Sequence, residues 1–369
     1  MERITVELGE RSYPIYIAAD FSVLGNAFRK AGIGGKVLVV TDSNVGRLYL
    51  ETCMAELASA GALVCSHVIE AGEKSKNLDT VKDIYRQLAA QRFDRNSTIA
   101  ALGGGVTGDI AGFAAATYMR GISYVQIPTS LLAQADSSIG GKTGVDFEGV
   151  KNIVGAFYQP RFVYINIGTL RTLPLRELRS GLAEVIKHGL IKDAGFYDYI
   201  RLNMRKIFEF DESTLQHITR ANCSIKKSVV EQDEKESGLR AVLNLGHTIG
   251  HAVESVSGFS LLHGECVSIG IAGAFRLALK MGMVSNTVAE EVELTLEAAG
   301  LPVRAAGMEP KQIHAEMLHD KKAKGGKLNF VLPTRIGEVT VRTLDDERIL
   351  MEVLEELVGR DPAYKNPAK

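Results

Sequence analysis

The sequence lacks the features that define several large classes of proteins. No apolar run approaches the roughly 18 residues of a membrane-spanning helix, and residues 1–17 contain no signal-peptide core. The four cysteines stand singly, without a CxxC pair, which is typical of buried thiols in a reducing compartment and not of a disulfide or zinc-ribbon framework. We therefore expect a cytoplasmic protein.

Net charge is also nearly absent. The formal net charge of -1 provides no overall attraction to nucleic acid or acidic membranes, so we expect neither partner, and any positive site must be built locally. Internal repeats and low-complexity blocks are missing as well. By contrast, 46% of the 369 residues are hydrophobic, which is enough to bury a substantial core, and the length favours two domains.

The two halves of the chain differ in their hydrophobic pattern. In the first half, β-rich runs alternate with helix-like segments, which indicates βαβ units and a parallel sheet with helices on both faces. From about residue 175 the pattern changes to long amphipathic helices, with a short return to strand character at 327–341. The sequence predicts a Rossmann-like α/β nucleotide-binding domain over residues 1–174, an α-helical domain over 175–369, and a single site between them. The β-rich runs are 36–42, 62–70, 97–104, 123–130 and 161–167.

A glycine-rich turn follows the predicted strand at 97–104. Gly103, Gly105 and Gly108 have the GxGxxG spacing, which lets backbone amides approach a pyrophosphate at a helix N-terminus. The acidic residue that usually follows about 20 positions later is missing, so a structural turn is the alternative.

Two further loops support nucleotide binding. Asp42 and Asn44 follow a strong strand and are suited to hold a ribose. The turn AGEKSK, residues 71–76, adds charges on what would be the same carboxyl edge of the sheet. Together with the glycine turn, these loops favour a nucleotide site over a purely structural turn.

The second half contains residues that could bind a divalent metal. His247 and His251 are spaced i, i+4 at the start of a predicted helix, so both rings can lie on one face. His263, Glu184 and His188 are further candidates. The spacing is not that of the HExxH proteases, and a single histidine here would more often be a core or capping residue. Spacing alone does not choose among these ligands.

Cationic side chains recur in polar or glycine-rich settings. Lys142 and Lys151 stand among small residues that leave an ammonium group little hydrophobic cover, and a phosphate or carboxylate ligand would explain them. For any one lysine, a solvated surface position is the ordinary alternative. The other cations are Arg120, Lys187, Lys226, Arg240, Lys321 and Lys322, and Asp136, Asn152 and Asn244 are suited to bind substrate hydroxyls.

At these motifs the chain resembles the 3-dehydroquinate synthase family over nearly its whole length. The resemblance implies a homodimer that binds NAD and one zinc ion, or cobalt, in a cleft between an α/β and an α-helical domain. It also implies conversion of 3-deoxy-D-arabino-heptulosonate 7-phosphate into 3-dehydroquinate and phosphate, with the C5 hydroxyl oxidised and later re-reduced by NAD. The segments that carry it are 103–121, 127–146, 151–160, 173–189, 233–254, 261–265 and 320–333.

The resemblance also implies roles for individual residues. The metal ligands fall on Glu184, His247 and His263, and Arg120 reaches the site of the partner subunit. Substrate is positioned by Lys142, Asn152, Lys187, Lys226, Arg240, Asn244, His251 and one of Lys321 and Lys322. Asp136, a candidate from its residue type, is also among the predicted substrate residues. NAD is assigned to Asp42, Asn44, Glu73, Lys76, Gly104, Gly105, Val106, Asp109, Thr129, Ser130, Lys151, Thr169, Leu170, Thr172 and Glu177, and the predicted NAD site also includes Ala71, Gly72, Lys74, Ser75, Thr107, Gly108, Lys142 and Arg171.

Three other functions compete with this interpretation. Related sugar-phosphate cyclases typically change the residues that match Lys226, Asn244 and His251, all three of which are of the dehydroquinate type here. A polyol dehydrogenase of the same superfamily would release NADH and would not need so many phosphate-binding cations. A non-catalytic nucleotide or metal sensor would explain the glycine turn but not the metal ligands and anion-binding cations beside it.

Overall fold

A computed structural model describes most of the chain. The described chain divides into two compact units, Met1–Pro174 with Phe210–Lys235 and Leu175–Glu209 with Glu236–Lys369. The predicted contiguous division at residue 174 differs from this grouping in Phe210–Lys235, because helix α8 (Glu212–Gln232) packs on the first unit. The described residues are 1–236, 238–323, 328–344 and 346–359, without the side chains of 319–323.

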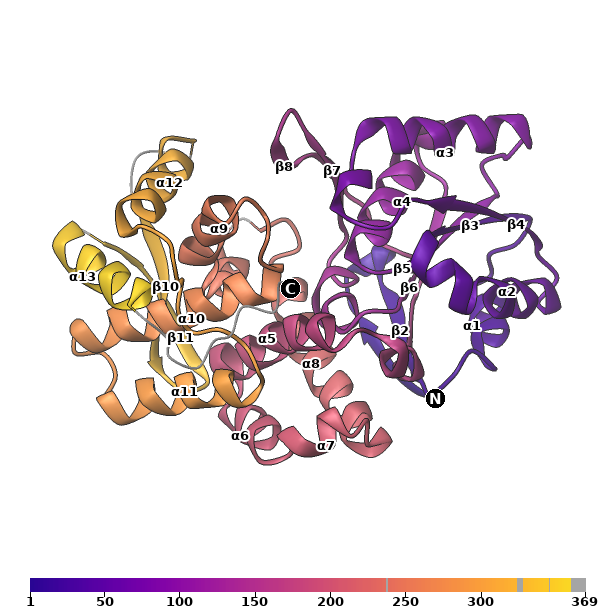
Figure 1. Cartoon of the computed structure of the whole chain (residues 1–369). Coiled ribbons are helices and arrows are strands. Elements are labelled where there is room, and N and C mark those ends of the chain that lie inside the picture. Colours follow the sequence, from indigo (N-terminus) through magenta and orange to yellow (C-terminus); the bar gives the residue numbers. More distant parts are fainter. Residues whose placement is uncertain (237, 324–327, 345, 360–369) are drawn as a thin grey trace. The chain divides into compact units, whose positions relative to one another are not determined.

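The first unit is built on a sheet of seven strands within the described residues, in the order β1-β2-β9-β6-β5-β3-β4 (Figure 1). The pairing of β1 with β2 is antiparallel, and the pairings among the other described strands of this sheet are parallel. This confirms the predicted parallel α/β fold. The strands are β1 (Glu2–Val6), β2 (Tyr13–Ala18), β3 (Lys36–Asp42), β4 (Leu63–Ile69), β5 (Thr98–Gly103), β6 (Ser123–Pro128) and β9 (Val163–Asn166).

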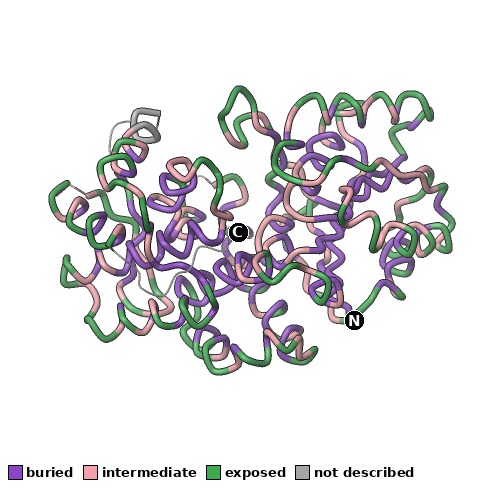
Figure 2. Tube along the Cα trace, viewed as in Figure 1, coloured by how far each residue is buried: buried purple, intermediate pink, exposed green. Residues whose placement is uncertain are grey.

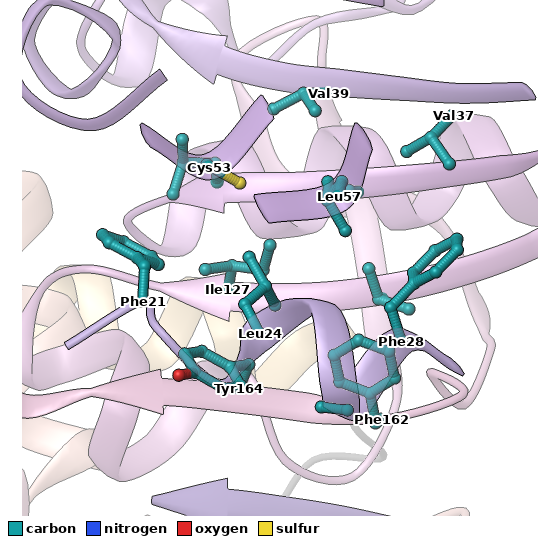
Figure 3. Packing of buried hydrophobic residues seen from close by; sticks show 14 of the residues in the cluster. Phe21, Leu24, Phe28, Val37, Val39, Cys53, Leu57, Ile127, Phe162 and Tyr164 are labelled. Atoms are coloured by element: carbon teal, nitrogen blue, oxygen red, sulfur yellow. The ribbon is translucent and has the colours of Figure 1, made fainter. Parts of the chain in front are cut away.

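Helices cover both faces of this sheet. Successive side chains of a strand point to opposite faces, so each buried strand contributes residues to both cores. Val37 and Val39 of β3 belong to a core with α1 (Leu24–Lys30) and α2 (Ser43–Ser59), shown in Figure 3. Leu38 and Val40 belong to the core of the other face. The helices on that face are α3 (Leu78–Ala90) and α4 (Gly105–Thr117).

Several local features of the first unit were not predicted as elements, among them strands β1 and β2. A single π-helical turn spans Ala133–Ser137. Strands β7 (Lys142–Phe147) and β8 (Val150–Phe157) form an antiparallel hairpin. The hairpin contacts α4, so the lysine-bearing segment after the turn is held on the first unit.

The second unit is helical, as predicted, with one added hairpin in its described part. Most of α10 is buried (Figure 2), because its run of glycine, alanine and branched apolar residues permits close packing on all sides. Strands β10 (Asn329–Arg335) and β11 (Glu338–Thr343) form the hairpin at the predicted strand-like segment. The helices are α5 (Leu175–Lys192), α6 (Ala194–Leu202), α7 (Met204–Phe208), α9 (His247–Val256), α10 (His263–Lys280), α11 (Asn286–Ala298), α12 (Pro310–Ala323) and α13 (Glu347–Val358).

None of the helices in the described ranges combines the length and apolar character that a bilayer crossing requires.

Candidate functional site

The predicted nucleotide residues of the first unit follow the carboxyl ends of neighbouring parallel strands. Thr169 follows β9, Thr129 follows β6, Gly104 follows β5, Asp42 ends β3 and Glu73 follows β4. These strands are consecutive in the sheet, so the five loops share one edge, which we call the carboxyl edge. Open α/β sheets bind ligands at this edge.

The glycine turn forms the centre of the carboxyl edge. Gly103 ends β5, Gly104 is the N-cap of α4, and α4 begins at Gly105. The amide of Thr129 donates to the carbonyl of Gly103 at 3.0 Å. A side chain at Gly105 would have its Cβ 3.2 Å from the Ser137 hydroxyl. The turn is therefore tight, and it presents the unpaired first amides of α4.

Asp42 connects the carboxyl edge to two helices. Its Oδ1 accepts from the amides of Asn44 at 2.9 Å and Val45 at 3.0 Å, which caps α2. Thr107 donates to the Oδ2 of Asp42 at 3.4 Å. One oxygen of Asp42 is therefore committed to capping, and the other faces the glycine turn.

Two ion pairs join the turn after β4 to its neighbours. The Nζ of Lys76 lies 2.7 Å from the Oδ2 of Asp109 on α4. The Nζ of Lys151 on β8 lies 3.6 Å from the Oε1 of Glu73. The carbonyl of Lys76 accepts from the amide of Asp146 at 2.8 Å. The predicted NAD residues on these loops therefore pair with one another, and the β7–β8 hairpin is tied to the same edge.

The other predicted NAD residues serve varied local roles. The hydroxyls of Thr172 and Tyr49 are hydrogen-bonded at 2.5 Å. The guanidinium of Arg171 donates to the carbonyl of Phe210 at 3.1 Å. Leu170 is fully buried. Glu177 lies on α5 of the second unit. The remaining residues lie in the turn after β4 (Ala71, Gly72, Lys74 and Ser75), the start of α4 (Val106 and Gly108) and the loop after β6 (Ser130).

Predicted substrate residues of the first unit lie on five elements. Asp136 of the π-helical turn pairs with Lys226 of α8. Lys142 is the first residue of β7 and is exposed. Asn152 of β8 has a φ of 54°, and its backbone N–H donates to the Oδ1 of Asp146 at 2.8 Å. The remaining residue is Arg120, which is exposed and has a φ of 67°.

The second unit brings Glu184, His247 and His263 together, and we call them the Glu–His–His group. Each offers a ligand atom within 4.8 Å of the others. The Nε2 atoms of His263 and His247 lie 3.3 Å and 3.7 Å from the Oε1 of Glu184. The two histidines are the first residues of α10 and α9, and Glu184 lies in the middle of α5.

Charges around this group set the protonation states of its three side chains. Lys187 pairs with Glu184 one helical turn away, which favours the ionised carboxylate. Burial and then Lys187 hold the pKa of His247 well below its usual range, so this imidazole is neutral. Burial lowers the pKa of His263, but Glu184 and Glu254 outweigh it and raise the pKa to about 9. A metal ion binding here would therefore replace a proton on His263.

Further predicted residues of the second unit lie on the same helices and in the turn before α9. Arg240 is buried, and Asn244 donates to Glu236 at 3.3 Å. His188 is buried on α5, and His251 is exposed, with its ring 5.1 Å from that of His247. The side chains of Lys321 and Lys322 lie outside the described part of the chain.

Sequence reasoning missed Glu254. This residue forms a second group with His251 and His263, whose candidate ligand atoms also lie within 4.8 Å of one another. The available signal was its spacing, because positions 247, 251 and 254 fall on one face of a helix.

Comparisons with known proteins cover nearly the whole chain. A family model described as 3-dehydroquinate synthase N-terminal matches residues 66–180, and one described as 3-dehydroquinate synthase C-terminal matches 181–323. The 3-dehydroquinate synthase of Acetivibrio thermocellus is 56% identical over 97% of this chain and 99% of the relative. That of Ruminiclostridium cellulolyticum is 55% identical over the same shares.

Solved structures with this fold include two further synthases. A 2-deoxy-scyllo-inosose synthase complexed with carbaglucose-6-phosphate, NAD+ and Co2+ has a TM-score of 0.87 and 25% identity, and covers 97% of this chain and 100% of that one. The 2-epi-5-epi-valiolone synthase of Streptomyces hygroscopicus, with NAD+ and Zn2+ bound, has a TM-score of 0.87 and 30% identity over 95% and 98% of the two chains.

Proposed function

Because the chain belongs to the 3-dehydroquinate synthase family, we propose that it is a lyase that converts 3-deoxy-D-arabino-heptulosonate 7-phosphate into 3-dehydroquinate and phosphate. This reaction belongs to the shikimate pathway, which leads to chorismate and aromatic amino acids. The observation that carries the proposal is the Glu–His–His group beside Lys187. Its carboxylate and two imidazoles are suited to bind a divalent metal, which would hold the substrate alcohol while it is oxidised.

The donor set fits a divalent metal. One carboxylate and two imidazoles are typical ligands of catalytic zinc, with a fourth position left for substrate. Glu184, His247 and His263 would hold the ion, and Lys187 would keep Glu184 ionised. The carboxyl edge, with Asp42, the glycine turn and the loops after β6 and β9, would hold NAD. When bound, these groups supply reversible hydride transfer at C5 and polarisation of the C5 oxygen.

The remaining residues would bind and orient a polyanion. Lys142, Lys226 and Arg240 offer charges for the phosphate and carboxylate, and Asn152 and Asn244 offer amide donors for hydroxyls. His251, Asp136, Lys187 and one of Lys321 and Lys322 complete the proposed substrate residues. The departing phosphate can itself accept the C6 proton, so the protein needs no separate strong base.

We also propose a homodimer in which Arg120 reaches the site of the partner subunit. Arg120 is exposed, so its side chain is accessible at the surface. Light scattering of the wild-type protein and of R120A would test the assembly, and mixing R120A with a second inactive variant would test the shared site. Partial recovery of activity in the mixture is expected.

The test of the reaction is a phosphate-release assay with the heptulosonate phosphate, with NADH followed by absorbance and the product identified by mass spectrometry. We expect 3-dehydroquinate and phosphate in equal amounts, with NAD required only catalytically. Stoichiometric NADH would instead indicate a dehydrogenase. Turnover of a hexose phosphate in place of the heptulosonate phosphate would indicate another cyclase.

A further inference from the structure

Glu254 is a buried carboxylate that faces one of the proposed metal ligands. Glu254 lies on α9 and is 7% exposed. Its Oε2 lies 3.9 Å from the Nδ1 of His263, whose Nε2 lies 3.3 Å from Glu184. The two nitrogens of this ring therefore face two different carboxylates.

His247 has the same arrangement with a different partner. Its Nδ1 lies 3.2 Å from the carbonyl of Leu245, while its Nε2 is directed toward Glu184. A carbonyl oxygen can only accept, so the Nδ1 of His247 is the donor and its Nε2 keeps a lone pair. A carboxylate next to the Nδ1 of His263 selects the same tautomer.

We infer that Glu254 is a positioning residue that holds the Nδ1–H of His263 and leaves Nε2 available to the divalent cation. This inference rests on the proposed metal site. Metal-bound histidines commonly donate their second nitrogen to a carboxylate, which fixes the ring and raises its basicity. An approach of about 1 Å brings the pair within hydrogen-bonding distance.

Another glutamate close to His263 in sequence has a different task. Glu265 binds Arg176 through two contacts of 2.7 Å and accepts the amide of Leu262 at 2.8 Å. It therefore stabilises the start of α10. Glu254 is held by a different helix, so it can fix the orientation of the His263 ring independently of that helix start.

The experiment measures zinc affinity by competition with a chromophoric chelator for wild type, E254Q and E254L. We expect E254L to bind zinc about 10–100-fold more weakly, and E254Q to lie between it and wild type because an amide oxygen still accepts. The absorption spectrum of the cobalt-loaded protein should change in E254L. E316Q is the matched control, because Glu316 bonds Ser255 on the same helix at 2.9 Å, and it should behave as wild type.

The other variants separate the explanations. Wild-type affinity and an unchanged cobalt spectrum in E254L would overturn the inference, as would an equal loss of affinity in H251A, since Glu254 would then act through His251. If E254L does not fold, the isosteric E254Q decides the result, with melting of the metal-free protein as the check. If wild type binds no zinc, or H263A binds it as tightly as wild type does, the metal site itself is wrong, which is a different failure.

Discussion

The ammonium of Lys76 lies 2.7 Å from the carboxylate of Asp109, with side chains only 7% and 18% exposed. The pair joins the turn after β4 to the first turns of α4, across the carboxyl edge. Burial lowers the pKa of Lys76, but Asp109 outweighs it and the net pKa is raised. Lys76 is therefore charged in the folded protein.

We expect the D109N variant to lose about 3 kcal/mol of folding stability, the lower end for a broken buried pair, because it leaves the ammonium without its closest partner. The K76M/D109N double variant should lose less folding stability than K76M and D109N lose when their separate losses are added. Urea denaturation of all four proteins measures this coupling. Additive losses would mean that the two charges act independently.

The ion pair between Arg11 and Glu234 should make stability depend on pH. Arg11 holds the pKa of Glu234 below its ordinary value of 4.5, helped by Gln159. A lowered carboxyl pKa stabilises the fold above that value, and the stabilisation is lost as pH falls through the folded pKa. Because Arg11 is 61% exposed, solvent screens the pair and its contribution to stability should be small.

The pH test compares unfolding free energies of wild type, E234Q and R11Q from neutral to acid pH. Both variants should be less stable than wild type near neutrality, and the difference should close below the carboxyl pKa. A difference that persists unchanged in acid would assign the effect to packing instead.

The core between the sheet and α2 should be sensitive to truncation. Leu57 is fully buried in the cluster of Figure 3, whereas Leu48 of the same helix is 54% exposed. L57A should therefore lose about 2–5 kcal/mol through lost burial and the cavity left behind. L48A should change stability by no more than about 0.5 kcal/mol. Equal losses in chemical denaturation would mean that burial in this core does not set the effect, because alanine is at least as good a helix former as leucine.

Lys142→Ala should weaken substrate use more than NAD binding. A charge-assisted bond of this kind contributes about 1.5–3 kcal/mol, roughly one to two orders of magnitude in the affected constant. The Michaelis constants for substrate and NAD, with turnover, measure the split. Lys30→Ala, at an exposed helix end, is the control. A K142A profile like that of the control would remove Lys142 from the proposed site.

The positions of the main elements were predictable because their signals are local. Strands β3 and β5 are buried on both faces and form short continuous apolar runs, which periodicity detects directly. Helix α9 carries the 3.6-residue pattern of an apolar face, and α10 is apolar on nearly all sides. The π-helical turn at Ala133–Ser137 was not predicted, because its conformation depends on contacts such as the bond from Asn222 to the carbonyl of Ala135.

For the candidate site, the sequence by itself determined the kinds of ligand, and tertiary structure decided which ones meet. Glu184 and His263 are 79 positions apart by their numbers, and only the packing of α5 against α10 brings their ligand atoms together. Glu254, the pairing of Lys76 with Asp109, and the assignment of α8 to the first unit also depend on distant segments. Periodicity describes which face of an element is buried. It does not specify the opposing side chains, because those contacts form only when the elements pack.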